Sequence, residues 1–143
     1  KTPDKRKEGS ILMYFLDTDI LIGHLRNNLQ AKHKIQTLLS KDQDVYTSVI
    51  NIHELIKGAY LSQTPENNME KVNVLLQAID VLSFDKQAAF ISGPLSAFHE
   101  KKGSMIAQND LFIASLALSR NLILITRNIK HFEGIERLQI ESW

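Results

Sequence analysis

Short apolar runs alternate along the chain with longer segments in which apolar residues recur at helical spacing. Continuous apolar or β-branched runs of about four to eight residues are typical of strands buried in a parallel sheet. We therefore predict strands at residues 11–16, 45–50, 81–84 and 122–126, and a final edge strand at 138–140. Helices are predicted between them, beginning near Thr18 and then covering residues 31–40, 51–61, 65–79, 86–102 and 110–120.

This alternation of strands and helices predicts an α/β fold. Right-handed crossover connections would place the strands in a parallel sheet with helices on its faces. Ligands of such folds bind beyond the carboxyl ends of the strands. Residues that directly follow a strand, or that begin the next helix, are therefore the best candidates for a functional site.

The amino-acid composition of the chain excludes several classes of function. The 143 residues suit one domain, which we expect at 11–143 after a charged, flexible tail at 1–10. The absence of cysteine excludes thiol catalysis and a Cys-ligated zinc site. No apolar run approaches the ~20 residues of a membrane span, and the N-terminus lacks an apolar signal-peptide core, so we expect a cytoplasmic protein. The net charge of +1 argues against a general basic coat for nucleic acid, but not against a local groove.

Four polar residues occupy such positions, after a predicted strand or at the start of a helix. Asp17 ends the first strand, Glu54 lies in the helix after the second, Asp110 begins a buried helix, and Asn128 follows the strand at 122–126. Carboxylates gathered beside apolar runs would repel one another, and a hard divalent cation such as Mg²⁺ removes that cost. A cation held this way can activate water for phosphodiester hydrolysis.

Each of these residues also has an ordinary structural interpretation. Asp17 could simply end a strand, and Asp110 could cap its helix. Asn51 and Glu54 fit an N-x-x-E capping box, and Asn128 fits a turn. Only the joint pattern favours a site.

Four segments carry a family resemblance. They are MYFLDTDILI at 13–22, SVINIHELIKGA at 48–59, MIAQNDLFIASLAL at 105–118 and LILITRNIKHF at 122–132. In order and spacing they resemble the PIN domain, specifically the VapC-type toxin ribonucleases of bacterial toxin–antitoxin pairs. The resemblance runs from about residue 13 to 143.

The resemblance implies a PIN-like three-layer α/β/α sandwich with a small, mainly parallel sheet. It also implies an endoribonuclease dependent on Mg²⁺, for which Mn²⁺ can substitute, that is neutralised by a cognate antitoxin and forms a homodimer or a toxin–antitoxin hetero-oligomer. Asp17, Glu54 and Asp110 match the family's catalytic metal ligands. Asn128 lies where many members have an acid, and Asp19 is either an auxiliary ligand or, as we favour, a helix cap.

RNA approaching this acidic centre would need cations nearby. Arg127, Lys130 and Lys57 are the first candidates because they lie close in sequence to the ligand positions. Arg26, Lys101 and Lys102 are further candidates. Attack by water would leave 5′-phosphate and 3′-hydroxyl ends on the cleaved RNA.

Two other functions are compatible with parts of the sequence. The D-x-D of LDTDI also fits a haloacid-dehalogenase-type phosphatase, with Asp17 as nucleophile and Asp19 as general acid. Leu21 stands where that family has Thr or Val, and no later acidic pair resembles its metal motif. Asn128 suggests the second alternative, a catalytically degenerate PIN fold that binds RNA or a partner.

Overall fold

The computed structural model describes residues 12–143, so the flexible tail predicted at 1–10 lies outside the described residues. Within them the chain forms one five-stranded sheet in which every neighbouring pair is parallel, in the order β3-β2-β1-β4-β5. The strands are β1 (Met13–Leu16), β2 (Asp44–Ser48), β3 (Asp80–Leu82), β4 (Ile123–Ile125) and β5 (Gln139–Glu141). The predicted α/β class with a parallel sheet is confirmed, and the first strand lies at the sheet's centre.

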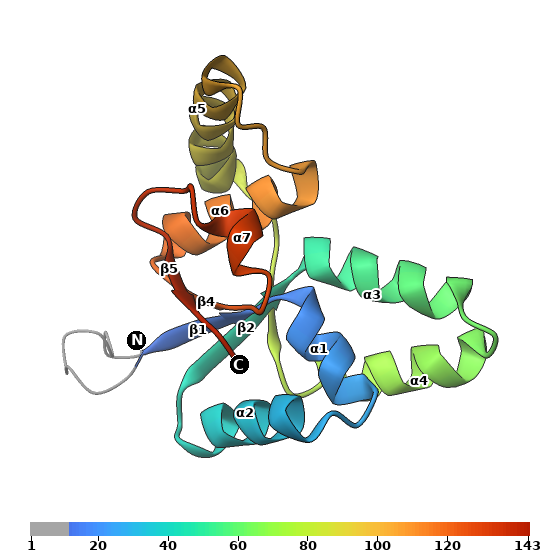
Figure 1. Cartoon of the computed structure of the whole chain (residues 1–143). Coiled ribbons are helices and arrows are strands. Elements are labelled where there is room, and N and C mark those ends of the chain that lie inside the picture. The colour runs from blue at the N-terminus through green and yellow to red at the C-terminus, as the bar shows by residue number, and fades with distance from the viewer. Residues whose placement is uncertain (1–11) are drawn as a thin grey trace.

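Helices cover both faces of the sheet (Figure 1). One face carries the first four helices and the other carries the last three. Their bounds are α1 (Thr18–Leu25), α2 (Leu29–Ser40), α3 (Val49–Leu61), α4 (Pro65–Leu76), α5 (Lys86–Lys102), α6 (Gln108–Arg120) and α7 (Ile129–Phe132). This is the three-layer sandwich that the resemblance implied.

Alternating side chains of the central strands supply the two hydrophobic cores. Leu16 and Ile125 point into the core shared with α1 to α4, whereas Phe15 and Leu124 point into the core shared with α5 to α7. All four are completely buried. The sheet is therefore apolar on both faces, which is why its strands read as continuous apolar runs rather than as alternating ones.

The strand β2 is shorter than the sequence predicted. The β-branched pair at 49–50 favoured an extended strand, but Ser48 caps α3 by accepting hydrogen bonds from the amides of Ile50 and Asn51 at 3.2 and 3.4 Å. The capping box predicted at Asn51 and Glu54 is therefore wrong. Since Glu54 lies a turn inside the helix, its carboxylate is free to face the end of the sheet.

Two other details concern the helices. The helix α5 continues through Pro94 and has the predicted bounds. The four-residue helix α7 was not predicted, and it follows β4 directly after Asn128. Neither changes the layer arrangement. None of the helices in residues 12–143 has the length and apolar character to cross a membrane.

Candidate active site

Asp17 is the most deeply placed charged residue at the carboxyl end of the sheet. It directly follows β1, its amide extends the ladder by donating to the Ile125 carbonyl at 3.0 Å, and its side chain caps α1. One carboxylate oxygen accepts from the Thr18 amide at 2.8 Å and the other from the Thr126 hydroxyl at 2.8 Å. With 4% of its surface exposed, Asp17 is held in one position by the strand, the helix and the neighbouring strand's end.

The electrostatics of Asp17 reflect this burial. Its pKa rises from the ordinary value of 3.8 to about 6, chiefly because burial removes water from the carboxylate. The hydrogen bonds from Thr126 and Thr18 lower the pKa, and the negative charges of Asp19 and Asp110 raise it further. An acid at this position is costly to ionise, and a cation nearby would reduce that cost.

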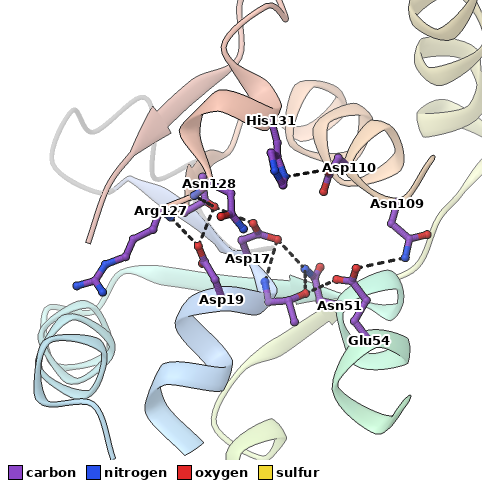
Figure 2. A network of polar contacts seen from close by, with 11 residues as sticks. Asp17, Asp19, Asn51, Glu54, Asn109, Asp110, Arg127, Asn128 and His131 are labelled. Carbon is purple, nitrogen blue, oxygen red and sulfur yellow. Dashed lines mark hydrogen bonds and ion pairs between the residues drawn. The ribbon is translucent and has the colours of Figure 1, made fainter. Parts of the chain in front are cut away.

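Glu54 belongs to the same hydrogen-bonded network through helix α3. Its Oε1 accepts from the Thr18 hydroxyl and its Oε2 accepts from the Asn109 side-chain amide at 3.2 Å. The fully buried Asn51, one turn earlier on α3, donates to the Thr18 hydroxyl at 3.0 Å and to Asp17 at 3.3 Å. The network therefore joins α1, α3 and α6 (Figure 2).

Asp110 completes the group from the first turn of α6. It is not the cap of that helix, because the cap position is Ala107. Its carboxylate lies 3.2 Å from Nδ1 of His131. The pKa of Asp110 is raised, first by burial and then by the charge of Glu54, whereas His131 acts in the opposite direction.

The three predicted acids thus lie at one edge of the sheet (Figure 2), where the charge of Asp110 raises the pKa of Asp17 and the charge of Glu54 raises that of Asp110. We call Asp17, Glu54 and Asp110 the acidic cluster. Its members come from three different elements, and only the parallel topology brings them to the same edge.

The acidic cluster has the chemistry of a hard-cation site without forming one in this arrangement. Across residues 12–143, no three His, Asp or Glu side chains are grouped so that they could hold one metal ion. Glu54 and Asp110 are instead turned to the partners Asn109 and His131. An all-oxygen, negatively charged donor set, in which the pKa values of Asp17 and Asp110 are raised, nevertheless fits Mg²⁺ or Mn²⁺. Binding one would require these side chains to exchange their present partners for the ion.

Asp19 and Asn128 lie next to the acidic cluster. The prediction that Asp19 caps α1 is wrong, because Asp17 is the cap. Asp19 accepts from the Arg127 amide at 2.7 Å and from the Trp143 indole at 3.2 Å, so it ties the start of α1 to the chain's last residue. Asn128 is exposed, and its amide donates to the Thr126 hydroxyl that holds Asp17.

The predicted RNA-contacting cations are placed very differently. The Arg127 guanidinium stacks 3.5 Å from the centre of the Trp143 ring and bonds to the Trp143 carbonyl and to Gln30. It points away from the acidic cluster (Figure 2), so the expectation that it reaches the site does not match the structure. Lys130 lines a groove together with Asp110, and Lys57 is exposed on α3.

Three contributors to the site were not singled out from the sequence. Asn51 was interpreted as a cap, and Asn109 and His131 were given no role. Asn109 and His131 lie within the third and fourth motifs, so their proximity to ligand positions was the available signal. Nothing in the sequence indicated that Trp143 would reach Asp19.

A sequence model of the PIN domain matches residues 14–138. The chain belongs to the PIN-domain family. The D-x-D at Asp17 and Asp19 is accordingly the first motif of a PIN domain rather than that of a phosphatase. The family match and the three-layer parallel fold agree with the resemblance carried by the four sequence motifs.

Relatives within the PIN-domain family cover nearly the whole chain. It is 37% identical over 133 residues to Ribonuclease VapC1 of Haemophilus influenzae (strain R2866), covering 92% of this chain and 98% of the relative. It is 33% identical to the tRNA(fMet)-specific endonuclease VapC of Salmonella typhimurium, covering 93% and 99%.

Solved structures show the same likeness. The fold matches VapBC2 from Rickettsia felis, bound to a DNA fragment from its promoter, with a TM-score of 0.86 and 32% identity over 92% of this chain and 99% of that one. DNA-bound VapBC from Salmonella typhimurium matches with a TM-score of 0.84 and 33% identity, covering 92% and 98%.

Proposed function

We propose that this PIN-domain protein is a metal-dependent endoribonuclease that acts as the toxin of a toxin–antitoxin pair. The observation that carries the proposal is the acidic cluster, in which the buried Asp17 and the charge of Asp110 are brought to the carboxyl edge of the sheet. Relatives of nearly equal length are named as ribonucleases, which supports RNA as the substrate.

Asp17, Glu54 and Asp110 would hold the cation, Mg²⁺ or Mn²⁺. When bound, such an ion supplies a Lewis acid that lowers the pKa of water and offsets charge on the phosphate. The chain's own residues then have separate tasks. Thr126 and Asn51 keep the Asp17 carboxylate oriented toward the site. Asn128 and Asp19 remain candidates for auxiliary contacts at its edge.

The decisive test is cleavage of RNA by the purified chain in Mg²⁺ or Mn²⁺, compared with Asp17→Asn. We expect the wild type to cleave, leaving 5′-phosphate and 3′-hydroxyl ends, and the variant to lose at least about 100-fold in rate because the charge that would hold the cation is removed. Equal rates in both proteins, or 2′,3′-cyclic phosphate ends, would contradict the assignment. RNA binding without any cleavage would favour the degenerate binding module that Asn128 suggests.

We propose that the antitoxin binds in a groove beside the acidic cluster. A groove of about 150 Å³ lies between α1, α3 and α4, with Ile22, Leu55 and Val72 among its apolar lining and Glu54 at its edge. An amphipathic antitoxin segment would bury its apolar side chains there and bring a basic one to the acids. Solved relatives named as VapBC complexes support a protein partner. Association of this chain into dimers is part of the same proposal.

A further inference from the structure

A second groove leaves the acidic cluster on the opposite side of the sheet. It lies between the end of α5, the start of α6 and α7, which share one face of the sheet (Figure 1). We call it the α5–α7 groove, and the residues that matter here are Lys102, Met105, Asp110, Lys130 and His131. Asp110 and His131 also form the pair described above, so this groove opens directly into the proposed site.

The size of the α5–α7 groove suits a nucleotide. Its volume is about 500 Å³, compared with about 150 Å³ for the groove beside Glu54. Sites for small organic ligands commonly span roughly 300–1,000 Å³. The larger groove could therefore hold a nucleotide next to the acidic cluster.

The chemistry of the groove also favours RNA over a protein segment. Lys102 and Lys130 place two cations along it, and Glu133 is the acid that lines it besides Asp110. Met105 is 77% exposed, and the His131 side chain is 57% exposed while Asp110 holds its Nδ1. Single-stranded RNA is bound by cations that follow the phosphates and by rings or apolar side chains that contact the bases. Since the Arg127 guanidinium is engaged by Trp143, these lysines are the better source of positive charge.

We propose that the α5–α7 groove binds the RNA strand on one side of the scissile phosphodiester. Lys102 and Lys130 contact phosphates, and Met105 and His131 contact the adjoining base. The choice of RNA as the ligand rests on the proposed ribonuclease function. The proposal assigns substrate binding to a surface separate from the apolar groove between α1, α3 and α4.

Binding can be measured without cleavage in the Asp17→Asn protein, using anisotropy of a fluorescein-labelled single-stranded RNA. Lys102→Gln and Lys130→Gln are added singly to that background, and Lys86→Gln, at the exposed first position of α5, is the matched control. Each groove variant should weaken binding about three- to tenfold and reduce the slope of log affinity against log salt by about 0.7. Met105→Ala should weaken binding about threefold without changing that slope. Lys86→Gln should change neither quantity.

In the catalytically intact protein, the groove variants should raise KM for the RNA and leave kcat nearly unchanged. Affinity and salt slope equal to those of Lys86→Gln would overturn the groove proposal even if the wild type cleaves RNA. Lysine-dependent binding by a protein that never cleaves would instead support the groove and reject the ribonuclease. Weakened capture of an antitoxin, with RNA binding unchanged, would overturn the groove proposal and make this surface a protein interface.

Discussion

Asp17 is the residue at which burial and charge are most directly opposed. Its pKa of about 6 in the folded protein exceeds the ordinary value of 3.8. Between these values the unfolded chain releases a proton that the folded chain retains. The free energy of unfolding therefore falls as the pH rises through this window and stays lower above it. At neutral pH the loss is on the order of 3 kcal/mol.

Asp17→Asn should accordingly stabilise the metal-free protein at pH 7.5, by roughly 2–3 kcal/mol. Asparagine keeps an acceptor for the Thr18 amide and can donate to the Thr126 hydroxyl, so the neighbouring contacts survive. Urea unfolding in EDTA measures the effect, which should disappear near pH 4. Asp80→Asn, at the exposed start of the edge strand β3, is the control and should change the stability by less than about 0.5 kcal/mol. Parallel profiles for wild type and Asp17→Asn would contradict the prediction.

Residue patterns predicted the cluster's members better than their partners. Asp17 and Glu54 follow an apolar and a β-rich run, whereas Asp110 begins a buried helix, and a parallel α/β fold brings both kinds of position to the carboxyl edge of the sheet. The Arg127 side chain points to Trp143, which lies far along the chain from most of the site. Its direction therefore depends on where Trp143 packs after folding. Proximity in sequence to Asn128 could not reveal that contact.

At the level of elements, the short connections after strands do most of the positioning. The β1–α1 and β2–α3 junctions have no loop residues beyond the capping residue itself. Asp17 directly follows β1, Ser48 is the last residue of β2, and each caps the next helix. The strands and helices were predictable because packing against the two hydrophobic cores requires apolar residues at the spacing typical of each kind of element. The β2–α3 boundary was not, since the β-branched residues 49 and 50 favour a strand while Ser48 favours a helix start.

Ser48→Ala tests how far the start of α3 supports the site. Besides capping the helix, the Ser48 hydroxyl donates to the side-chain Oδ1 of the buried Asn51 at 2.6 Å. Losing both contacts should cost about 2–3 kcal/mol in urea unfolding. The rate of RNA cleavage should fall more than the unfolded fraction explains, because Asn51 orients Thr18 and Asp17.

The matched variant is Asn28→Ala, which removes the cap of α2 away from the acidic cluster. It should cost about 1 kcal/mol and leave kcat unchanged. If Ser48→Ala retained full kcat while losing stability, α3 would support the fold but not the orientation of the site.

On the scale of the whole molecule, positive and negative charges nearly balance but lie in different places. The net charge is only +1, yet acids are concentrated at the carboxyl edge of the sheet and lysines line the groove that leaves it. The buried and mutually repelling charges of the acidic cluster lower the free energy of unfolding. A bound group that neutralises these charges would raise it again. A cation and a basic antitoxin side chain would both neutralise this charge. Ion binding can therefore be measured as an increase in the stability of the full chain.

Mg²⁺ or Mn²⁺ added to EDTA-treated protein should therefore raise the melting temperature. An ion at about 100 times its Kd contributes roughly 2.7 kcal/mol, or on the order of 5–10 °C for a chain of this size. The shift should shrink below about pH 6, because protons then compete for Asp17. It should be largely absent in Asp17→Asn and preserved in Asp80→Asn, whose acid is exposed on the edge strand β3. A shift of equal size in Asp17→Asn would mean that the ion binds elsewhere, and the acidic cluster would lose its role as a metal site.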